Sequence, residues 1–333
     1  MPKNKKKLPY NPLPEYLAIG PSQIHGAGIL ATEDIPGEVV IGITHVYDPN
    51  FQHHHIRTPL GGFINHSENP NCELIEDEDD DYTSYDYPSG WKDTYDGSIE
   101  DESGREFIME PEFGDDALKK ISNFCDWLRN EEFYVDNSCG LHVHTDAFYL
   151  GVEQLKGILL VSRALEPFIY KMIPKRRAES RYSKPMDEID SKIILEVKNA
   201  RDFCDLWYET MNYTKATTEK YNESRYRGLN LHSRFFHGTI EYRYHHGTIS
   251  DYYINNWVLF CLAISDYGKN FLNLEKKSVF NLFVNKESKD FSDYLTAMGV
   301  SNLIPYVKEM IERRSPESSN TGKKTVWTYS SLS

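Results

Sequence analysis

GLHVHTD, residues 140–146, alternates apolar and ionisable side chains in the middle of a 333-residue chain. Successive side chains of a β-strand point to opposite faces, so His142, His144 and Asp146 share one face, opposite the apolar residues between them. The pattern predicts a strand that is buried on one side and polar on the other. A solvated sheet surface and a ligand-binding site both produce this pattern, and alternation alone does not separate them.

A second strand with the same character is predicted at GTIEYRYHH, residues 238–246. Its alternation places Glu241, Arg243 and His245 on one face and apolar or aromatic residues on the other. Two strands therefore each present an ionisable stripe. If the stripes lie side by side, they form one polar wall of a concave site.

REFIME, residues 105–110, is a third predicted strand, with Glu106 and Glu110 on one face. Hard divalent cations prefer carboxylate oxygen, so Glu106 and Glu241 are better candidates for Mg²⁺ than the histidines are, although one histidine is compatible with Mn²⁺. Zinc is the alternative, because a histidine pair on a strand together with a carboxylate can form a hydrolytic centre. If the metal is Mg²⁺ or Mn²⁺, Arg243 would bind phosphate.

Helices are predicted between these strands. Apolar side chains recur at helical spacing over residues 115–132, 151–173 and 250–267. The aspartate pair at 115–116 and Ser250 are suitable to cap the first and the last of them. Because the intervening helices differ in length and number, we expect an α+β fold with a mostly antiparallel sheet and flanking helices rather than a regular βαβ winding.

Composition limits the class of protein. The chain is 39% hydrophobic and 13% aromatic, which excludes a wholly disordered protein, and it has no apolar run near the roughly 20 residues that cross a bilayer, so no membrane partner is expected. Its net charge of −14 disfavours nucleic acid as a partner. The five cysteines are scattered without a C-x-x-C pair, which favours reduced thiols and a cytoplasmic location.

Six segments stand in an order that resembles the amidoligase family, which comprises ATP-dependent carboxylate–amine ligases related to glutamine synthetase and glutamate–cysteine ligase. They lie between about Trp91 and Trp257: GWKDTYDGSI, REFIMEP, NSCGLHVHTD, PKRRAESRYSKP, YRGLNLHS and GTIEYRYHHGTIS. The resemblance implies the glutamine synthetase-like catalytic fold, a curved antiparallel sheet forming a funnel. ATP and Mg²⁺ or Mn²⁺ would enter from one side, and small-molecule or peptide carboxylate and amine substrates from the other.

The resemblance also implies roles for residues in these segments. The metal ligands would be Glu106, Glu241 and His144. The catalytic residues would be Arg243, which stabilises phosphate, and His142. The substrate or nucleotide side would be lined by Arg181, Arg225 and Asn230. These ligases usually begin with a G-x-E-x-E strand that supplies further carboxylates, and no such pattern occurs before Asp96, so the first metal-binding strand is missing.

The N-terminal part resembles a different family, the SET-domain lysine methyltransferases. IHGAGILATEDIPGE followed by FINHSENPNCEL is similar to the opening and the NHS motif of that fold, over about residues 16–75. The segment that would carry the catalytic tyrosine is absent, so the resemblance implies a small, all-β, partial module. The residues that would contact S-adenosylmethionine are Gly26, Gly28, Asn65 and His66.

The predicted organisation has five parts: a basic tail over 1–15, the partial SET-like module over 16–75, an acidic linker over 76–90, the amidoligase-like domain over 91–313 and a flexible tail over 314–333. Three functions follow as hypotheses. The chain is a ligase that forms an amide or isopeptide bond, a lysine methyltransferase, or a fusion of two degenerate modules that only binds a partner.

Overall fold

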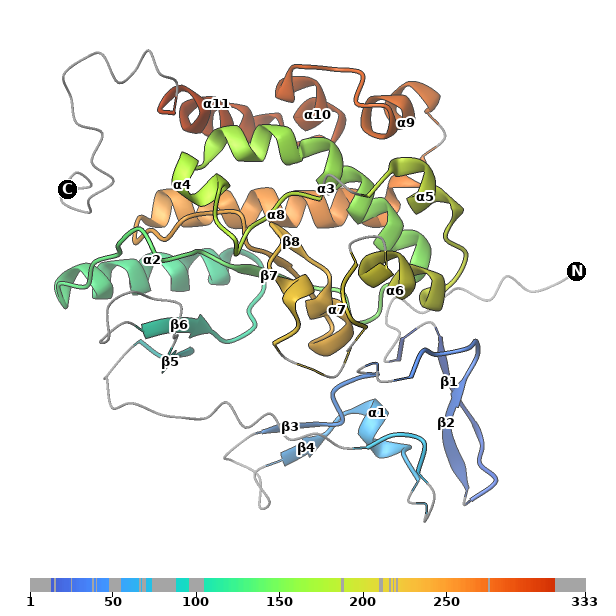
Figure 1. The fold of residues 1–333 in the computed structure, drawn as a ribbon. Coiled ribbons are helices and arrows are strands. Elements are labelled where there is room, and N and C mark those ends of the chain that lie inside the picture. Colours follow the sequence, from blue (N-terminus) through green and yellow to red (C-terminus); the bar gives the residue numbers. More distant parts are fainter. Residues whose placement is uncertain are drawn as a thin grey trace, which may run out of the picture.

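The computed structural model describes residues 13–314, except 15, 25, 38, 40, 48–54, 66, 68–69, 74–87, 96–104, 187–188, 210–211, 216, 218, 220 and 275. Most of the predicted basic tail, acidic linker and flexible tail therefore lies outside the described residues. The described part combines helices with small antiparallel sheets (Figure 1), which confirms the predicted α+β class.

The described strands pair only in antiparallel fashion, as predicted, but they form four small sheets in place of one curved sheet. Three of the sheets are two-stranded: β1 (Leu17–Pro21) with β2 (Ala27–Ala31), β3 (His45–Tyr47) with β4 (His55–Arg57), and β5 (Trp91–Tyr95) with β6 (Arg105–Met109). The fourth has the order β7 (Val143–Asp146), β9 (Thr239–Tyr242), β8 (Leu229–Asn230). Each strand is at most five residues long, and helix α2 (Gly114–Asn130) separates β6 from β7 along the chain.

Two long helices, α3 (Val152–Met172) and α8 (Asp251–Phe271), pack together at the centre of the main core. A Cβ on Gly157 would lie 2.1 Å from the carbonyl oxygen of Gly268, so the two backbones touch. The apolar face of the three-stranded sheet packs on α8, where Thr145 and Tyr242 both hydrogen-bond to the hydroxyl of Ser265 at 2.8 Å. The sheet is therefore held from behind by a rigid helix pair.

Shorter helices surround this centre. α9 (Lys277–Val284), α10 (Phe291–Ala297) and α11 (Ile304–Glu312) cover α3 on the side away from the sheet (Figure 1). The remaining ones are α1 (Pro59–Gly62), α2 (Gly114–Asn130), α4 (Lys175–Ala178), α5 (Ser191–Glu196), α6 (Ala200–Glu209) and α7 (His232–Phe236), with single 3₁₀ turns at Glu223–Arg225 and Ser301–Leu303. No helix of the described part is long and apolar enough to span a membrane.

The three helices predicted from apolar spacing are confirmed as α2, α3 and α8. The predicted caps need correction. The N-cap of α2 is Phe113, and Asp115 and Asp116 lie in its first turn, where they face the positive end of the helix. Ser250 does occupy the N-cap position of α8, but its side chain accepts no N–H from the helix.

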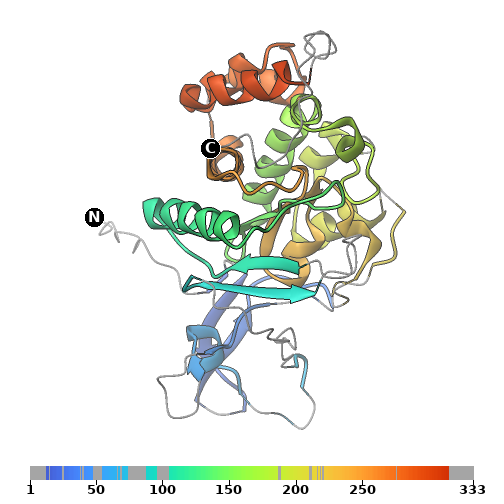
Figure 2. The same cartoon turned by 90° about the vertical axis from the view of Figure 1, so that its left-hand side faces the viewer.

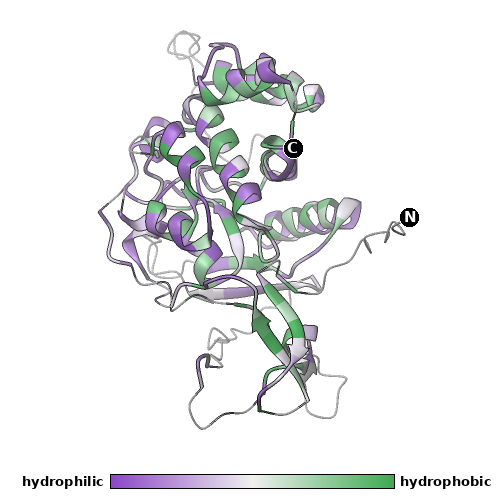
Figure 3. Ribbon diagram, turned by 90° about the vertical axis from the view of Figure 1, so that its right-hand side faces the viewer, coloured by the Kyte–Doolittle hydropathy of each residue, from purple (hydrophilic) through white to green (hydrophobic). Residues whose placement is uncertain are grey.

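The N-terminal hairpins meet the rest of the chain around one aromatic ring. Phe148 belongs to a small core cluster with Tyr16, Leu17 and Leu60. A Cβ on Gly42 would lie 2.2 Å from this ring, so glycine is what permits the contact. The β5–β6 hairpin lies between the N-terminal hairpins and the helices (Figure 2), and β1 and β2 are mainly hydrophobic in composition (Figure 3).

Candidate active site

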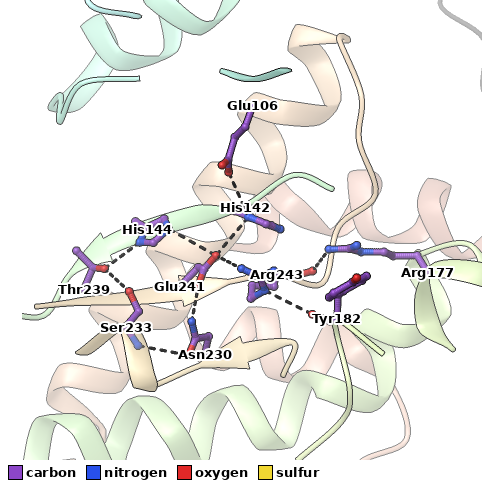
Figure 4. Close-up of polar contacts among 10 residues, drawn as sticks. All are labelled: Glu106, His142, His144, Arg177, Tyr182, Asn230, Ser233, Thr239, Glu241 and Arg243. Carbon is purple, nitrogen blue, oxygen red and sulfur yellow. Dashed lines mark hydrogen bonds and ion pairs between the residues drawn. The ribbon is translucent and has the colours of Figure 1, made fainter. Parts of the chain in front are cut away.

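The register of the three-stranded sheet places three polar residues in one row. His144 on β7 lies opposite Glu241 on β9, and Asn230 on β8 lies opposite Glu241 from the other side. Directly opposite residues of neighbouring strands point to the same face. Their side chains meet on one face of the sheet (Figure 4). Thr145 and Tyr242, on the opposite face, hydrogen-bond to Ser265 of α8.

Glu241 is the centre of this arrangement and is 5% exposed. One carboxylate oxygen, Oε1, lies 2.6 Å from Nη1 of Arg243, and the other, Oε2, accepts a hydrogen bond of 2.5 Å from Nδ2 of Asn230. Burial favours a raised pKa for this carboxyl group, but the positive charge of Arg243 outweighs it and, with the His144 side chain, holds the pKa well below its ordinary value. Glu241 is therefore a buried, charged carboxylate.

His144 is held in place from both ring nitrogens. Nδ1 lies 2.8 Å from Oγ1 of Thr239, which in turn lies 2.8 Å from Oγ of Ser233, while Nε2 lies 3.6 Å from Oε1 of Glu241. The Thr239 hydroxyl contacts the ring and is itself held by the Ser233 hydroxyl, so this chain of hydrogen bonds fixes the orientation of the imidazole. The side chain is 44% exposed, so this imidazole is open to a ligand.

His142 connects the sheet to the β5–β6 hairpin. Its Nδ1 lies 3.3 Å from Oε1 of Glu241 and 3.8 Å from Oε1 of Glu106 on β6 (Figure 4). Burial, followed by the positive charge of Arg243, lowers the pKa of His142 well below its ordinary value. The ring is therefore neutral at pH 7, with one nitrogen able to accept a proton or a hydrogen bond.

The structure thus brings together five residues that the sequence placed on three different strands. They are Glu106, His142, His144, Glu241 and Arg243. His245 does not join them. It lies beyond the end of β9, is fully buried and packs on His246 and Trp257, with ring centroids at 4.4 and 5.2 Å. The predicted alternation holds as far as Arg243 and fails at His245, which lies three residues past the end of β9.

Arg177 is a residue of this site that the sequence reasoning missed. Its Nη2 donates to the carbonyl oxygen of Arg243 at 2.6 Å, and a Cβ on Gly140 would lie 2.7 Å from this nitrogen and 3.1 Å from Nε2 of His142. Burial, followed by repulsion from Arg243, lowers the pKa of Arg177 to about 10. The charges of two guanidinium groups, Arg243 and Arg177, therefore act on His142. The signal available in the sequence was Gly140 beside a strand, where close approach of another group calls for glycine.

The three residues assigned to the substrate or nucleotide side fall in two places. Asn230 is inside the site, where its side chain donates a hydrogen bond to Glu241. Arg181 and Arg225 lie outside it, each over a tyrosine ring, at 4.7 Å from Tyr182 and 5.0 Å from Tyr221. The Tyr182 carbonyl accepts from Nε of Arg243 at 3.4 Å, so this arginine–tyrosine cluster adjoins the site without reaching Glu241.

The described side chains do not form a ready metal centre. Within the described residues, no group of three or more His, Cys, Asp or Glu side chains is arranged to hold a metal ion. The reason is visible at Glu241, whose two oxygens are engaged by Arg243 and Asn230, while Glu106 lies 3.8 Å from Nδ1 of His142. As arranged here, these residues do not fit a divalent cation.

The residues predicted to contact S-adenosylmethionine are partly brought together. Asn65 donates from Nδ2 to the carbonyl of Ala27 at 3.1 Å, and a Cβ on Gly28 would lie 2.9 Å from the same nitrogen and 3.0 Å from Cβ of Ser22. Gly26 adopts a φ of 56° in the turn between β1 and β2. His66 lies outside the described residues. Packing alone accounts for Gly28, because protein atoms fill the space above it.

Comparison with known protein families supports the resemblance to the amidoligases. The family model described as "Putative amidoligase enzyme" matches residues 55–265, a range that begins upstream of Trp91 and includes every one of the five residues gathered around Glu241. No curated protein and no solved structure matches the chain. The SET resemblance of the N-terminal part has no counterpart in this match. Because the matched range covers well over half of the chain, the protein belongs to the amidoligase family.

Proposed function

We propose that the protein is an ATP-dependent carboxylate–amine ligase that forms an amide or isopeptide bond through an acyl phosphate. The observation that carries this proposal is the convergence of Glu241, Arg243 and two histidines on one sheet face of an amidoligase-family chain. The proposed substrates are ATP, a small-molecule or peptide carboxylate, and an amine.

The reaction would proceed in two steps. A carboxylate oxygen of the acyl donor attacks the γ-phosphorus of ATP, the bond to the β-phosphate oxygen breaks, and ADP leaves. The amine nitrogen then attacks the acyl carbon, the carbon–oxygen bond to phosphate breaks, and the nitrogen loses a proton. Phosphoryl transfer of this kind depends on positive charge placed around the phosphoryl oxygens.

The residues around Glu241 suit these demands. Arg243 would stabilise the transferring phosphoryl group, and its guanidinium is held in one orientation by Glu241 and by the Tyr182 carbonyl. Arg177, which donates to the carbonyl oxygen of Arg243, adds a second positive charge. His142, neutral because of burial and of Arg243, would accept a hydrogen bond from the attacking amine.

Family membership adds the expectation of Mg²⁺ or Mn²⁺, with Glu106, Glu241 and His144 as the proposed ligands. For Glu241 to bind a cation, Arg243 would have to release an oxygen of its carboxylate. No step of the proposed reaction is therefore assigned to a metal, and metal dependence is left to measurement. One imidazole beside two carboxylates is compatible with Mn²⁺ as well as with Mg²⁺.

The arginine–tyrosine cluster is the proposed nucleotide or substrate side. Arg181 and Arg225 stack on Tyr182 and Tyr221, and stacked guanidinium and phenol rings offer flat surfaces for a base together with charge for phosphate or carboxylate. The cluster adjoins Arg243 through Tyr182. This location is consistent with a ligand whose phosphates reach Arg243.

The test is amine-dependent ADP release from ATP, with Mg²⁺ or Mn²⁺, over a panel of amino acids and peptides. We expect release with at least one pair of substrates, and a loss of about 100-fold or more in Glu241→Gln and Arg243→Met. Glu131→Gln, an exposed carboxylate at the end of α2, is the control and should remain active. Release that survives both substitutions in folded protein would show that the chemistry lies elsewhere, and no amine-dependent release at all would refute the proposal.

Lysine methylation is the second candidate. The hydrogen bond from Asn65 to Ala27 favours it, because it joins the two stretches that resemble the SET motifs. Against it, Ser22 and Asn65 fill the space above Gly28, where the cofactor would approach the backbone. Calorimetric titration with S-adenosylmethionine separates the two candidates. A saturable heat that is lost in Asn65→Ala would favour the methyltransferase, whereas the ligase predicts none.

A further inference from the structure

A cavity lies where the N-terminal hairpins meet the helical core. Its volume is about 240 Å³, and its lining comes from two parts of the chain: residues 16–39 on one side, and the start of α3 with α6 and α7 on the other. None of the residues gathered around Glu241 lines it. The cavity is therefore separate from the candidate active site.

Arg234, on α7, lines this cavity and is only 4% exposed. Its Nη2 donates to the carbonyl oxygen of Phe148 at 3.3 Å, while its Nε has no hydrogen-bond partner among the described residues. The described part of the chain also offers no carboxylate within ion-pair distance of this guanidinium. Buried charges in proteins are nearly always paired or bound to an ion. An unpaired buried arginine beside a cavity thus indicates an anionic ligand.

A second positive feature faces the same space. Gly151, the N-cap of the 21-residue helix α3, and Val152, its first residue, both line the cavity. The N-terminal end of a helix carries a partial positive charge and attracts anions. Glycine has no side chain that could cap this helix end, and the side-chain contact at Gly151 is with its own N–H, which donates to Oε1 of Gln154 at 2.9 Å. The hydroxyl of Tyr16, on the opposite wall, is likewise buried with no partner among the described residues.

The rest of the wall is mostly apolar. Ile35 and Val39 contribute from the N-terminal side, and Leu155, Phe203 and Phe235 from the helices. Ligand pockets for larger molecules are roughly 300–1,000 Å³, so this cavity suits a smaller one. An apolar wall with a single cation selects a ligand that is charged at one end and apolar elsewhere.

We propose that this junction cavity binds a small carboxylate with an apolar body, the carboxylate meeting Arg234 at the N-terminal end of α3. Two sources share this chemistry: a simple aliphatic acid and an apolar α-amino acid. Glu33, an exposed residue that also lines the cavity, would pair with the ammonium group of the amino acid. The site does not depend on ligase activity.

The proposal is tested by calorimetric titration of the full-length protein with three matched probes: 4-methylpentanoate, leucine and the neutral 4-methylpentanamide. We expect one of the two carboxylates to bind at least about tenfold more tightly than the amide. Tighter binding of leucine, lost in Glu33→Gln, identifies an amino acid site, and tighter binding of 4-methylpentanoate identifies a site for simple acids.

Two substitutions locate the binding. Arg234→Met removes the charge, and Val39→Trp fills the cavity from the N-terminal side while leaving Arg234 intact; each should weaken carboxylate binding by about tenfold or more. Arg201→Met, which removes an exposed guanidinium on α6, is the matched control and should bind as the unaltered chain does. If Arg234→Met does not fold, the binding measured for Val39→Trp decides whether the carboxylate occupies this cavity. The proposal is overturned if neither carboxylate binds more tightly than the amide, or if binding survives in a folded variant of either kind.

Discussion

Glu241 and Arg243 stand two residues apart and form an ion pair of 2.6 Å in which both side chains are less than a tenth exposed. Each side chain has a further hydrogen bond to the protein, because Asn230 donates to Glu241 and the Tyr182 carbonyl accepts from Arg243. Charges fixed in this way need no reorganisation when a negatively charged group arrives, which is what phosphoryl transfer requires of its surroundings.

Breaking this pair should destabilise the fold. In Glu241→Ala the guanidinium of Arg243 remains buried without its partner, and the expected loss in the free energy of unfolding is about 3–5 kcal/mol. Urea denaturation measures it. The control is Glu179→Ala, which removes an exposed partner from the Lys175–Glu179 pair and should cost about 1 kcal/mol or less. Equal losses in the two variants would mean that burial of the Glu241–Arg243 pair has no energetic consequence.

Asn230 donates a hydrogen bond to the carboxylate of Glu241 and is the position at which an added charge would act on it. In Asn230→Asp a second carboxylate takes the place of the donor, and two adjacent carboxylates raise the pKa of one of them. If the active form requires charged Glu241, the acidic limb of the pH profile for ADP release should move to higher pH. Asn230→Ala serves as the comparison, because it removes the hydrogen bond without adding charge. A profile that is identical in the Asp and Ala variants would argue against a role for the Glu241 charge.

Gly140 makes room for Arg177. In Gly140→Ala the new Cβ would lie 2.7 Å from Nη2 of Arg177, so the guanidinium must move away from the Arg243 carbonyl that it holds. We expect about a tenfold fall in ligase activity. Gly62→Ala, where the added Cβ meets nothing within 4 Å, is the matched control.

A double substitution tests the cause. If Gly140→Ala acts by displacing Arg177, then Arg177→Met and the combination of the two substitutions should have the same activity, because the clash has already been removed. Losses that multiply in the combined variant would instead point to a separate effect of the added Cβ, which would also lie 3.1 Å from Nε2 of His142.

Local periodicity was sufficient to predict helices and the polar face of the central strands. Apolar spacing located α2, α3 and α8, and alternation placed His144 and Glu241 on faces that turn out to be shared. The strand register itself was not readable, because the residues of the β7–β9 pair are separated by about a hundred positions and only tertiary packing brings them together. The family resemblance supplied that long-range order.

Two errors have identifiable physical causes. The alternation predicted over residues 238–246 holds as far as Arg243 and fails at His245, which lies past the end of β9 and is buried against Trp257. Arg177 was overlooked in favour of Arg181, since both lie in one basic segment and the choice depends on which of them reaches the Arg243 carbonyl. Such contacts depend on the path of a loop, for which sequence periodicity gives no rule.

The contact between α3 and α8 should tolerate no added atoms. In Gly157→Ala the new Cβ would lie 2.1 Å from the carbonyl oxygen of Gly268, a backbone atom that cannot rotate away. The helices would have to separate, and the expected cost is about 1–3 kcal/mol or more of unfolding free energy. Thermal unfolding measures it, with Gly62→Ala again as the control. An unchanged melting temperature would mean that the contact between α3 and α8 leaves room for a methyl group at this position.

His232 should make stability depend on pH. The ring is buried between the Tyr208 hydroxyl and the Glu219 carbonyl, and burial lowers its pKa to about 4, from 6.5 in an unfolded chain. The unfolded chain therefore takes up a proton between these values and the folded chain does not, so stability is complete above pH 6.5 and falls as the pH drops toward 4. Between pH 7.5 and 4.5 the unaltered chain should lose roughly 2–3 kcal/mol more than His232→Gln, in which this group is absent. Urea denaturation at both pH values gives the difference. Buried histidines elsewhere, such as His245, titrate equally in both proteins and cancel, so parallel losses in the two chains would show that His232 is not held neutral by the fold.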